Sequence, residues 1–125
     1  MKIHPINNEL IIEEMDDTTI DFFDLLKKKD SIKLVNCNNL IIKMTSKKIN
    51  HIEIINCNNL TIDIPSLISG LFIQKSDKVI INGDNSKFNN IDIIRSNNIQ
   101  MNYSKENFEN DLVNIYKSKN IFLLV

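Results

Sequence analysis

The sequence predicts an all-β protein, a right-handed parallel β-helix (a solenoid) of about six short coils, each of roughly 20 residues. The first observation is a repeat, because the pentapeptide NCNNL that begins at Asn36 recurs unchanged at Asn56. Weaker copies of the same corner begin at Asp16, Lys75, Arg95 and Lys117. The second observation is physical: a unit this short cannot bury its own apolar face, whereas stacked units can.

Apolar residues alternate with polar ones at two places in each unit, which is typical of strands with one buried face. After the corner the apolar pairs are Ile20 and Phe22, Leu40 and Ile42, Leu60 and Ile62, Val79 and Ile81, Ile99 and Met101, and Ile121 and Leu123. Later in the unit they are Ile32 and Leu34, Ile52 and Ile54, Leu71 and Ile73, Ile91 and Ile93, and Val113 and Ile115. Each unit is therefore expected to contain two strands.

The corner between the strands is expected to stack like positions from coil to coil, about 4.8 Å apart. A column of small residues should face inward, formed by Asp17, Cys37, Cys57, Ser76, Ser96 and Ser118. A second column should form a ladder, because Asn tolerates the left-handed backbone and its amides can stack. Its members are Thr19, Asn39, Asn59, Lys78, Asn98 and Asn120.

The length of 125 residues predicts one domain. We divide it into residues 1–15, an N-terminal cap or partial coil, and residues 16–125, the β-helix. A helix over Thr19–Lys29 competes with the first strand, but the alternation of Ile20, Asp21 and Phe22 favours the strand. Neither a six-residue left-handed repeat nor a Thr-x-Thr ladder is found.

Composition excludes several classes of function. The 15 basic and 16 acidic side chains give a net charge of −1, which argues against a nucleic-acid binder. No apolar run is long enough for a membrane span and no signal peptide is apparent, so we expect a cytoplasmic protein with no membrane partner. Abundant Ile and Asn are typical of AT-rich coding sequence, as in some protists and large DNA viruses.

No residue pattern indicates catalysis, a cofactor or a metal, and the protein is expected not to be an enzyme. Cys37 and Cys57 should be neighbours in adjacent coils, as two buried reduced thiols or, alternatively, as a disulfide. His4 and His51 are isolated, and no Cys/His spacing suits zinc. The acidic residues do not share one strand column, as polysaccharide-cleaving β-helices would require; the relevant column mixes Lys33, Glu53, Phe72, Asp92 and Asn114.

The runs over residues 35–43 and 48–57 resemble the CARP motif, which builds the C-terminal domain of cyclase-associated proteins and is shared with tubulin-binding cofactor C. The segments 66–76 and 88–93, the turn at Tyr103-Ser104-Lys105, and residues 111–125 resemble later coils of the same domain. The resemblance implies a module that binds ADP-bound actin monomers and promotes exchange of ADP for ATP. It also implies a dimer formed by a C-terminal hairpin. The sequence shows no such hairpin after Val125, so a homodimer would need another edge.

Two alternatives remain. Tubulin cofactor C is a GTPase activator whose signature includes an Arg-x-Arg pair, but Asp92 and Ile94 stand at those places here and Arg95 lies one residue further on. We therefore do not expect GTPase activation, because the arginine finger is absent. The other alternative is a structural, self-assembling β-helix protein of a virus or protist, in the virion or the host cytoplasm.

Partner contacts must come from outward residues, because the inward ones form the core. Phe72 is a large aromatic residue in a column that is otherwise mostly polar. Ile41, Ile80 and Phe122 share a column with Asp21, Thr61 and Gln100. Exposed apolar residues in a row indicate a contact face, so Ile41, Phe72, Ile80 and Phe122 are our candidate partner-binding residues. With actin as the partner, the protein would be associated with the cytoskeleton.

Overall fold

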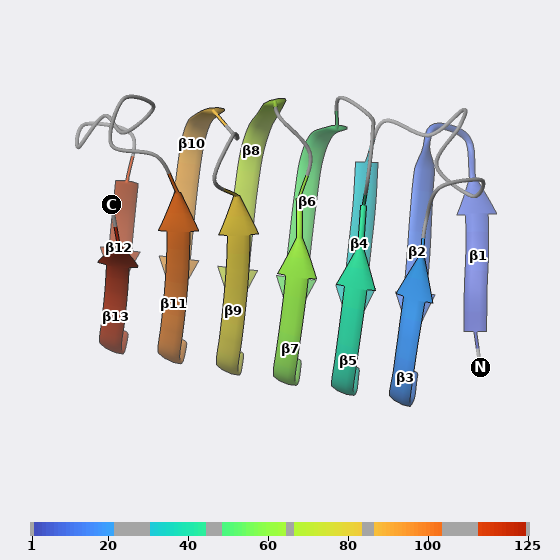
Figure 1. Cartoon of the computed structure of the whole chain (residues 1–125), viewed down its shortest axis with the longest axis horizontal. Coiled ribbons are helices and arrows are strands. Elements are labelled where there is room, and N and C mark those ends of the chain that lie inside the picture. The colour runs from blue at the N-terminus through green and yellow to red at the C-terminus, as the bar shows by residue number, and fades with distance from the viewer. Residues whose placement is uncertain are drawn as a thin grey trace.

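The computed structural model describes residues 2–21, 31–44, 49–64, 67–83, 87–103 and 113–124. Its strands form two facing sheets (Figure 1). Sheet A contains β1 (Lys2–Ile6), β2 (Glu9–Glu13), β4 (Ser31–Val35), β6 (Ile49–Ile55), β8 (Leu67–Gln74), β10 (Lys87–Ile94) and β12 (Val113–Tyr116). Sheet B contains β3 (Asp16–Asp21), β5 (Asn38–Lys43), β7 (Asn58–Asp63), β9 (Asp77–Gly83), β11 (Asn97–Tyr103) and β13 (Lys119–Leu124).

From β2 onward the chain alternates between the sheets, and every pairing within each sheet is parallel. In Figure 1 the sheet B strands lie in front and run upward, and the sheet A strands from β2 to β12 lie behind them and run downward. The chain advances from right to left. This path is right-handed, as parallel crossovers almost always are. The predicted class, a right-handed parallel β-helix, is confirmed.

We call each sheet A strand, its corner and the following sheet B strand a rung, from rung 1 (β2 and β3) to rung 6 (β12 and β13). A turn closes only where a sheet B strand is followed by another sheet A strand. Six rungs therefore close fewer than six turns, and the expected count of about six coils is slightly high. Among the described residues no helix occurs, and so none that could cross a membrane.

The core consists of inward columns in which like residues from successive rungs are neighbours. Ile32, Ile52, Leu71 and Ile91 form one column of sheet A, and all four are buried. Leu40, Leu60, Val79 and Ile99 form the facing column of sheet B, also buried. Branched aliphatic side chains suit this stacking because they pack well on a pleated surface. The alternation predicted for rungs 2 to 5 is confirmed.

Rung 1 differs from the predicted register. Asp16 pairs with Asn38, and Ile20 pairs with Ile42, so the interval to the next rung is 22 residues and not 20. Met15 is consequently the buried corner residue, whereas the prediction placed Asp17 there. The apolar Met15 fits the inward position and the carboxylate does not, because a buried unpaired charge is strongly unfavourable.

The same shift moves two other residues of rung 1. Thr19 pairs with Ile41, so Thr19 and not Asp21 belongs to the outward row of Ile41, and Asp17 takes the place in the ladder that was assigned to Thr19. Residues up to Asp21 form a strand. Phe22 and the remainder of the competing helix over Thr19–Lys29 lie outside the described residues.

Every corner contains two residues with left-handed backbone, separated by two others. The first column of these comprises Glu14, Asn36, Asn56, Lys75, Arg95 and Lys117, with φ between 49° and 57°. The second comprises Asp17, Asn39, Asn59, Lys78, Asn98 and Asn120, with φ between 52° and 58°. Asn is favoured at such positions because its short polar side chain reduces the steric penalty of positive φ. Of the two residues between these columns, the first has its side chain directed inward.

The inward corner column changes from Cys to Ser along the stack, and the Ser hydroxyls link the rungs. The backbone N–H of Ser76 donates to Oγ of Ser96 over 3.1 Å, and the N–H of Ser96 donates to Oγ of Ser118 over 3.0 Å. Each hydroxyl in turn donates to a carbonyl two residues earlier, as Ser96 does to Ile94 over 2.9 Å. A small side chain with both a donor and an acceptor thus satisfies the buried backbone of each corner.

The N-terminal segment pairs with the first rung. β1 runs antiparallel to β2 along its outer edge, with Ile3 opposite Ile12 and His4 opposite Ile11. This pairing satisfies backbone groups that a bare strand edge would expose. The division of the chain at residue 16 stays a prediction.

Candidate functional site

The outward face of sheet B presents the predicted apolar row. Residues Thr19, Ile41, Thr61, Ile80, Gln100 and Phe122 are successive neighbours across the six strands. Ile41 is 45% exposed, Ile80 is 36% exposed and Phe122 is 53% exposed. The structure therefore brings three of the four candidate residues into one row, which we call the apolar row. That this row contacts a partner stays a prediction.

A shallow depression of about 240 Å³ lies at the C-terminal end of the apolar row. Ile80 and Phe122 supply its apolar surface and Gln100 lies between them. Its remaining lining residues are Asn59, Lys78 and Asn98. An apolar floor edged by amides and one ammonium group can accept a hydrophobic side chain and hydrogen-bond to the polar groups around it.

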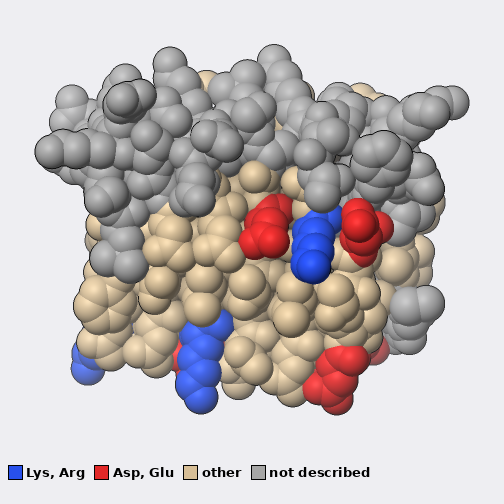
Figure 2. Space-filling view, in the orientation of Figure 1, with Lys and Arg blue, Asp and Glu red and all other residues tan. Residues whose placement is uncertain are grey.

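A row of amide side chains lies beyond the apolar row, near the ends of the strands. Asn82 donates to Asp63 over 2.9 Å, and Asn102 donates to Asn82 over 2.8 Å. Gln100 of the apolar row donates to Asn102 over 3.1 Å. Figure 2 shows this face with a largely uncharged band across its middle and charged side chains above and below it. The face is thus polar by amides more than by charge, which lowers the penalty for covering it with a partner.

Phe72 lies on the opposite sheet and does not belong to the apolar row. On sheet A it pairs with Glu53 on one side and Asp92 on the other, and it is half-buried. Three of the four candidate residues therefore share one row on sheet B, and Phe72 lies apart from them on sheet A. The sequence predicted separate columns for Phe72 and for the other three candidates, and it was wrong only at rung 1, where the row contains Thr19 and not Asp21.

The isolated histidines have local carboxylate partners. His51 Nε2 lies 3.1 Å from Oε1 of Glu53, and His4 Nε2 lies 3.9 Å from Oε2 of Glu13. The His51 ring leans over Gly70, its neighbour in register on β8. Within the described ranges no group of three or more His, Cys, Asp and Glu residues could hold a metal ion.

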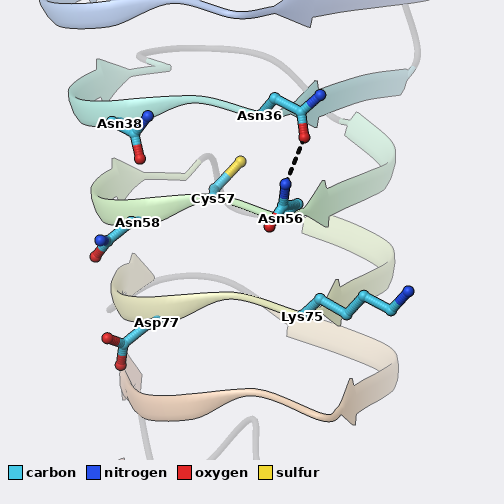
Figure 3. A pocket seen from close by; sticks show the side chains of 7 residues that line it. All are labelled: Asn36, Asn38, Asn56, Cys57, Asn58, Lys75 and Asp77. Atoms are coloured by element: carbon cyan, nitrogen blue, oxygen red, sulfur yellow. Dashed lines mark hydrogen bonds between the residues drawn. The ribbon is translucent and has the colours of Figure 1, made fainter.

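A second depression, of about 330 Å³, lies along the corners of rungs 2 to 4, and the sequence analysis did not single it out (Figure 3). Asn36, Asn56 and Lys75 line one side of it, and Asn38, Asn58 and Asp77 line the other, with Cys57 between the two columns. Asn56 donates to Asn36 over 2.7 Å. The signal was the tetrapeptide NCNN, which occurs at Asn36 and again at Asn56, because four of its six carboxamides line this depression.

Cys37 and Cys57 are neighbours in the inward corner column, and both are buried and not joined by a disulfide, as predicted for reduced thiols. A hydrogen bond from the Cys57 thiol lowers the pKa of Cys37 from 9.0 to about 7, against the opposing effect of burial. The same contact and burial raise the pKa of Cys57 well above its ordinary value. The pair can therefore hold one negative charge far more readily than two.

Carboxamide ladders link the rungs on both faces and at the corner, and they share one direction. In nine hydrogen bonds between described side chains of different rungs, Asn Nδ2 donates toward the N-terminal end of the stack. Most ladders begin at an aspartate, namely Asp16, Asp17, Asp63, Asp77 or Asp92. An ionised Asp only accepts, so it can stand only at the accepting end of a ladder.

These features define a class: a short-rung parallel β-solenoid with paired left-handed corners, whose candidate contact surfaces are outward rows. The model of the family "Adenylate cyclase associated (CAP) C terminal" matches residues 2–125, and the chain belongs to that family. No curated protein matches the chain in sequence.

Proposed function

We propose that this chain is an actin-monomer-binding module that regulates actin turnover. The observation that carries the proposal is the family match, which covers residues 2–125 and so includes every rung. The CARP resemblance of the corners implies the same partner. The apolar row supports a protein partner, because it exposes two isoleucines and a phenylalanine on one otherwise polar face.

In this proposal the apolar row is the anchor for actin, with the depression at Ile80 and Phe122 as its centre. Large side chains in a central pocket contribute most of the binding energy in protein interfaces, and the polar residues around them exclude water. The amides beside the row would supply hydrogen bonds at low desolvation cost. ADP-bound monomers are the expected form, and faster exchange of ADP for ATP is the expected consequence.

No chemical step is assigned to this chain. Nucleotide exchange on actin requires only that binding favour a conformation of actin that releases ADP more readily. The protein would then act in the cytoplasm with the cytoskeleton, without a cofactor. Self-association through the same row is the competing use of the surface, and it is favoured by the same exposed residues.

The test is a titration of labelled ADP-actin monomers with the purified chain, with nucleotide release followed in the same samples. Sedimentation equilibrium of the chain alone measures self-association over the same concentrations. Saturable binding with faster release supports the full proposal, and binding without faster release restricts it to sequestration. No binding at tens of micromolar, together with a dimer in sedimentation, would replace it with self-assembly.

A further inference from the structure

Charge is sorted along the corner of the solenoid. The corner of rung 1 contributes Glu14, Asp16 and Asp17, all carboxylates. The corners of rungs 2 and 3 are neutral, with three Asn and one Cys in each. The corners of rungs 4 to 6 contribute five cations and one carboxylate, Asp77; the cations are Lys75, Lys78, Arg95, Lys117 and Lys119. Figure 2 shows the same order along its lower margin, basic toward the left and acidic toward the right.

Three of these cations stand in consecutive rungs at one position of the corner. Lys75, Arg95 and Lys117 continue the column of Asn36 and Asn56. Neighbouring strands are about 4.8 Å apart, so the three cations span about 10 Å along the stack. Figure 3 shows the Lys75 side chain reaching outward from the corner, beyond the two carboxamides of its column. We call Lys75, Lys78, Arg95, Lys117 and Lys119 the basic ridge.

The backbone of this column makes the basic residues unexpected. Lys75, Arg95 and Lys117 have φ of 51°, 49° and 50°, in the left-handed region that Asn occupies with less strain. Rungs 2 and 3 use Asn there and gain an inter-rung hydrogen bond of 2.7 Å between Asn56 and Asn36. A cation at this place gives up both advantages, so local stability does not account for three of them in succession.

The ridge cations are exposed and have no carboxylate partner within the described residues. Lys117 lies over its neighbour Tyr116, 5.3 Å from the ring centroid, which leaves its ammonium group at the surface. The carboxylate nearest in sequence, Asp77, accepts a hydrogen bond of 2.7 Å from Asn98. Five exposed cations of like charge repel one another, and an anionic partner relieves that repulsion.

The shape of the charge distribution selects the partner. A nucleic acid carries charge along its whole length, and it would meet the carboxylates of rung 1 as well as the ridge. An acidic protein segment of three or four carboxylates is about as long as the ridge and ends before the acidic corner. The ridge also borders the depression at Ile80 and Phe122, because Lys78 belongs to both. One partner could therefore contact the ridge and occupy the depression.

We propose that the basic ridge is a docking site for a carboxylate-rich segment of a protein partner, and that the acidic corner of rung 1 fixes the orientation of that segment. The ridge supplies the charge complementarity, and the neighbouring depression supplies the apolar contact. Complementary charge of this kind increases the association rate and selects among partners. The proposal goes beyond actin binding, since it names a chemistry that does not depend on which acidic protein carries it.

The test uses a fluorescein-labelled octaglutamate peptide and fluorescence anisotropy at low and at physiological salt. The ridge variant is Lys75→Asn/Arg95→Asn, which introduces the residue that the same column already holds in rungs 2 and 3. The matched control is Lys33→Gln/Lys43→Gln, which removes two cations from the outward faces of the sheets. Both variants change the net charge equally, so only position distinguishes them.

We expect the wild type and the control to bind the peptide at low salt, and the ridge variant to bind at least about fivefold more weakly. Equal losses in both variants, or no loss in the ridge variant, would overturn the proposal, and so would absence of wild-type binding. An oligothymidylate of equal charge that binds as tightly as the peptide would also overturn the choice of an acidic protein segment.

The same variants in the ADP-actin titration separate this proposal from the previous one. Peptide binding at the ridge without any actin binding refutes the proposed function and keeps the docking site. Actin binding that is equally tight in the ridge variant, with no peptide binding, refutes the docking site and keeps the proposed function. Urea unfolding of each variant shows that the fold is intact.

Discussion

Asn59 donates a hydrogen bond of 2.6 Å from Nδ2 to Oδ1 of Asn39, and both residues have left-handed backbone, with φ of 57° and 56°. The two facts are connected. Identical backbone conformation at the same corner position places the carboxamides one above the other at the strand spacing, where they bond. Asn is suited to both requirements at once, which accounts for its recurrence at the corners.

Replacing Asn59 by Ala removes the ladder bond and places a Cβ without polar compensation at φ of 57°. We expect the free energy of unfolding to fall by about 1–2 kcal/mol. Asn59→Gly is the matched control, because Gly adopts this backbone freely and loses only the bond. Urea denaturation measures both. Equal losses in the two variants would show that backbone strain plays no part.

Ser96→Ala removes the acceptor of the buried Ser76 N–H, which now donates to Ser96 Oγ over 3.1 Å. An unsatisfied buried donor should lower the free energy of unfolding by about 1–3 kcal/mol. Ser96→Cys should be better tolerated, since Cys37 and Cys57 occupy the same column in rungs 2 and 3. Denaturant melts of the two variants test the order, and a Cys variant less stable than the Ala variant contradicts it.

A Cβ at Gly70 would lie 2.9 Å from His51 Nδ1, so Gly70→Ala must displace the His51 ring. The ring is the end of a flexible side chain, and the expected loss is under about 1 kcal/mol. In a His51→Ala background the same change should be stabilising by roughly 0.5–1 kcal/mol, because Ala is more favourable than Gly within a strand. A double-mutant cycle in urea measures this coupling, and additive effects would disprove the contact.

Cys57→Ala removes the thiol that lowers the pKa of Cys37 to about 7, so the pKa of Cys37 should rise, because burial is then opposed only by the weaker backbone hydrogen bonds at Met15 and Val35. In the wild type the folded pKa is below the unfolded one. The lowered pKa of Cys37 therefore contributes stability that is fully present above its unfolded pKa and is lost as the pH falls through about 7. The raised pKa of Cys57 acts in the opposite sense, because its contribution is lost as the pH rises above the unfolded pKa of that thiol. Ultraviolet thiolate absorbance of Cys57→Ala against pH measures the shift, and an unchanged midpoint would refute the hydrogen-bond explanation.

Ile80→Thr and Phe122→Gln replace two members of the apolar row with residues that the row itself holds at Thr61 and Gln100. Both side chains are exposed, so stability should change by less than about 0.5 kcal/mol. If the row is the anchor for actin, each should weaken ADP-actin binding about fivefold or more. Thr61→Ser is the control at the same row, and full affinity in both apolar variants would exclude the row as the contact.

The repeat made most of the solenoid predictable, because period-two alternation and a near-constant interval are local properties of the chain. The failure at rung 1 has a physical cause. Asp16 and Asp17 resemble the polar corner residues, so the repeat was aligned to them, although the buried place is taken by Met15. Requiring an apolar or small uncharged residue in the inward column would have given the correct register.

The candidate surface was predictable only by column. The sequence shows that Ile41, Ile80 and Phe122 recur at one position, and their row exists in the structure. It does not show that Phe72 lies on the other sheet, since the sheet that receives each strand is decided by the return connections. The basic ridge was missed because its members fall in three successive corners, about 20 residues apart in the chain, and these corners adjoin only after stacking.

The uniform direction of the carboxamide ladders has an electrical consequence. Aligned backbone amides give an α-helix its macrodipole, and here aligned side-chain amides point their N–H ends toward the N-terminal end of the stack, toward Asp16 and Asp17. Their dipoles add along the long axis, positive toward the acidic corner and negative toward the basic ridge. The solenoid thereby carries its own axial polarity, and the ionised side chains at its two ends are placed as charges are placed at the two ends of a helix.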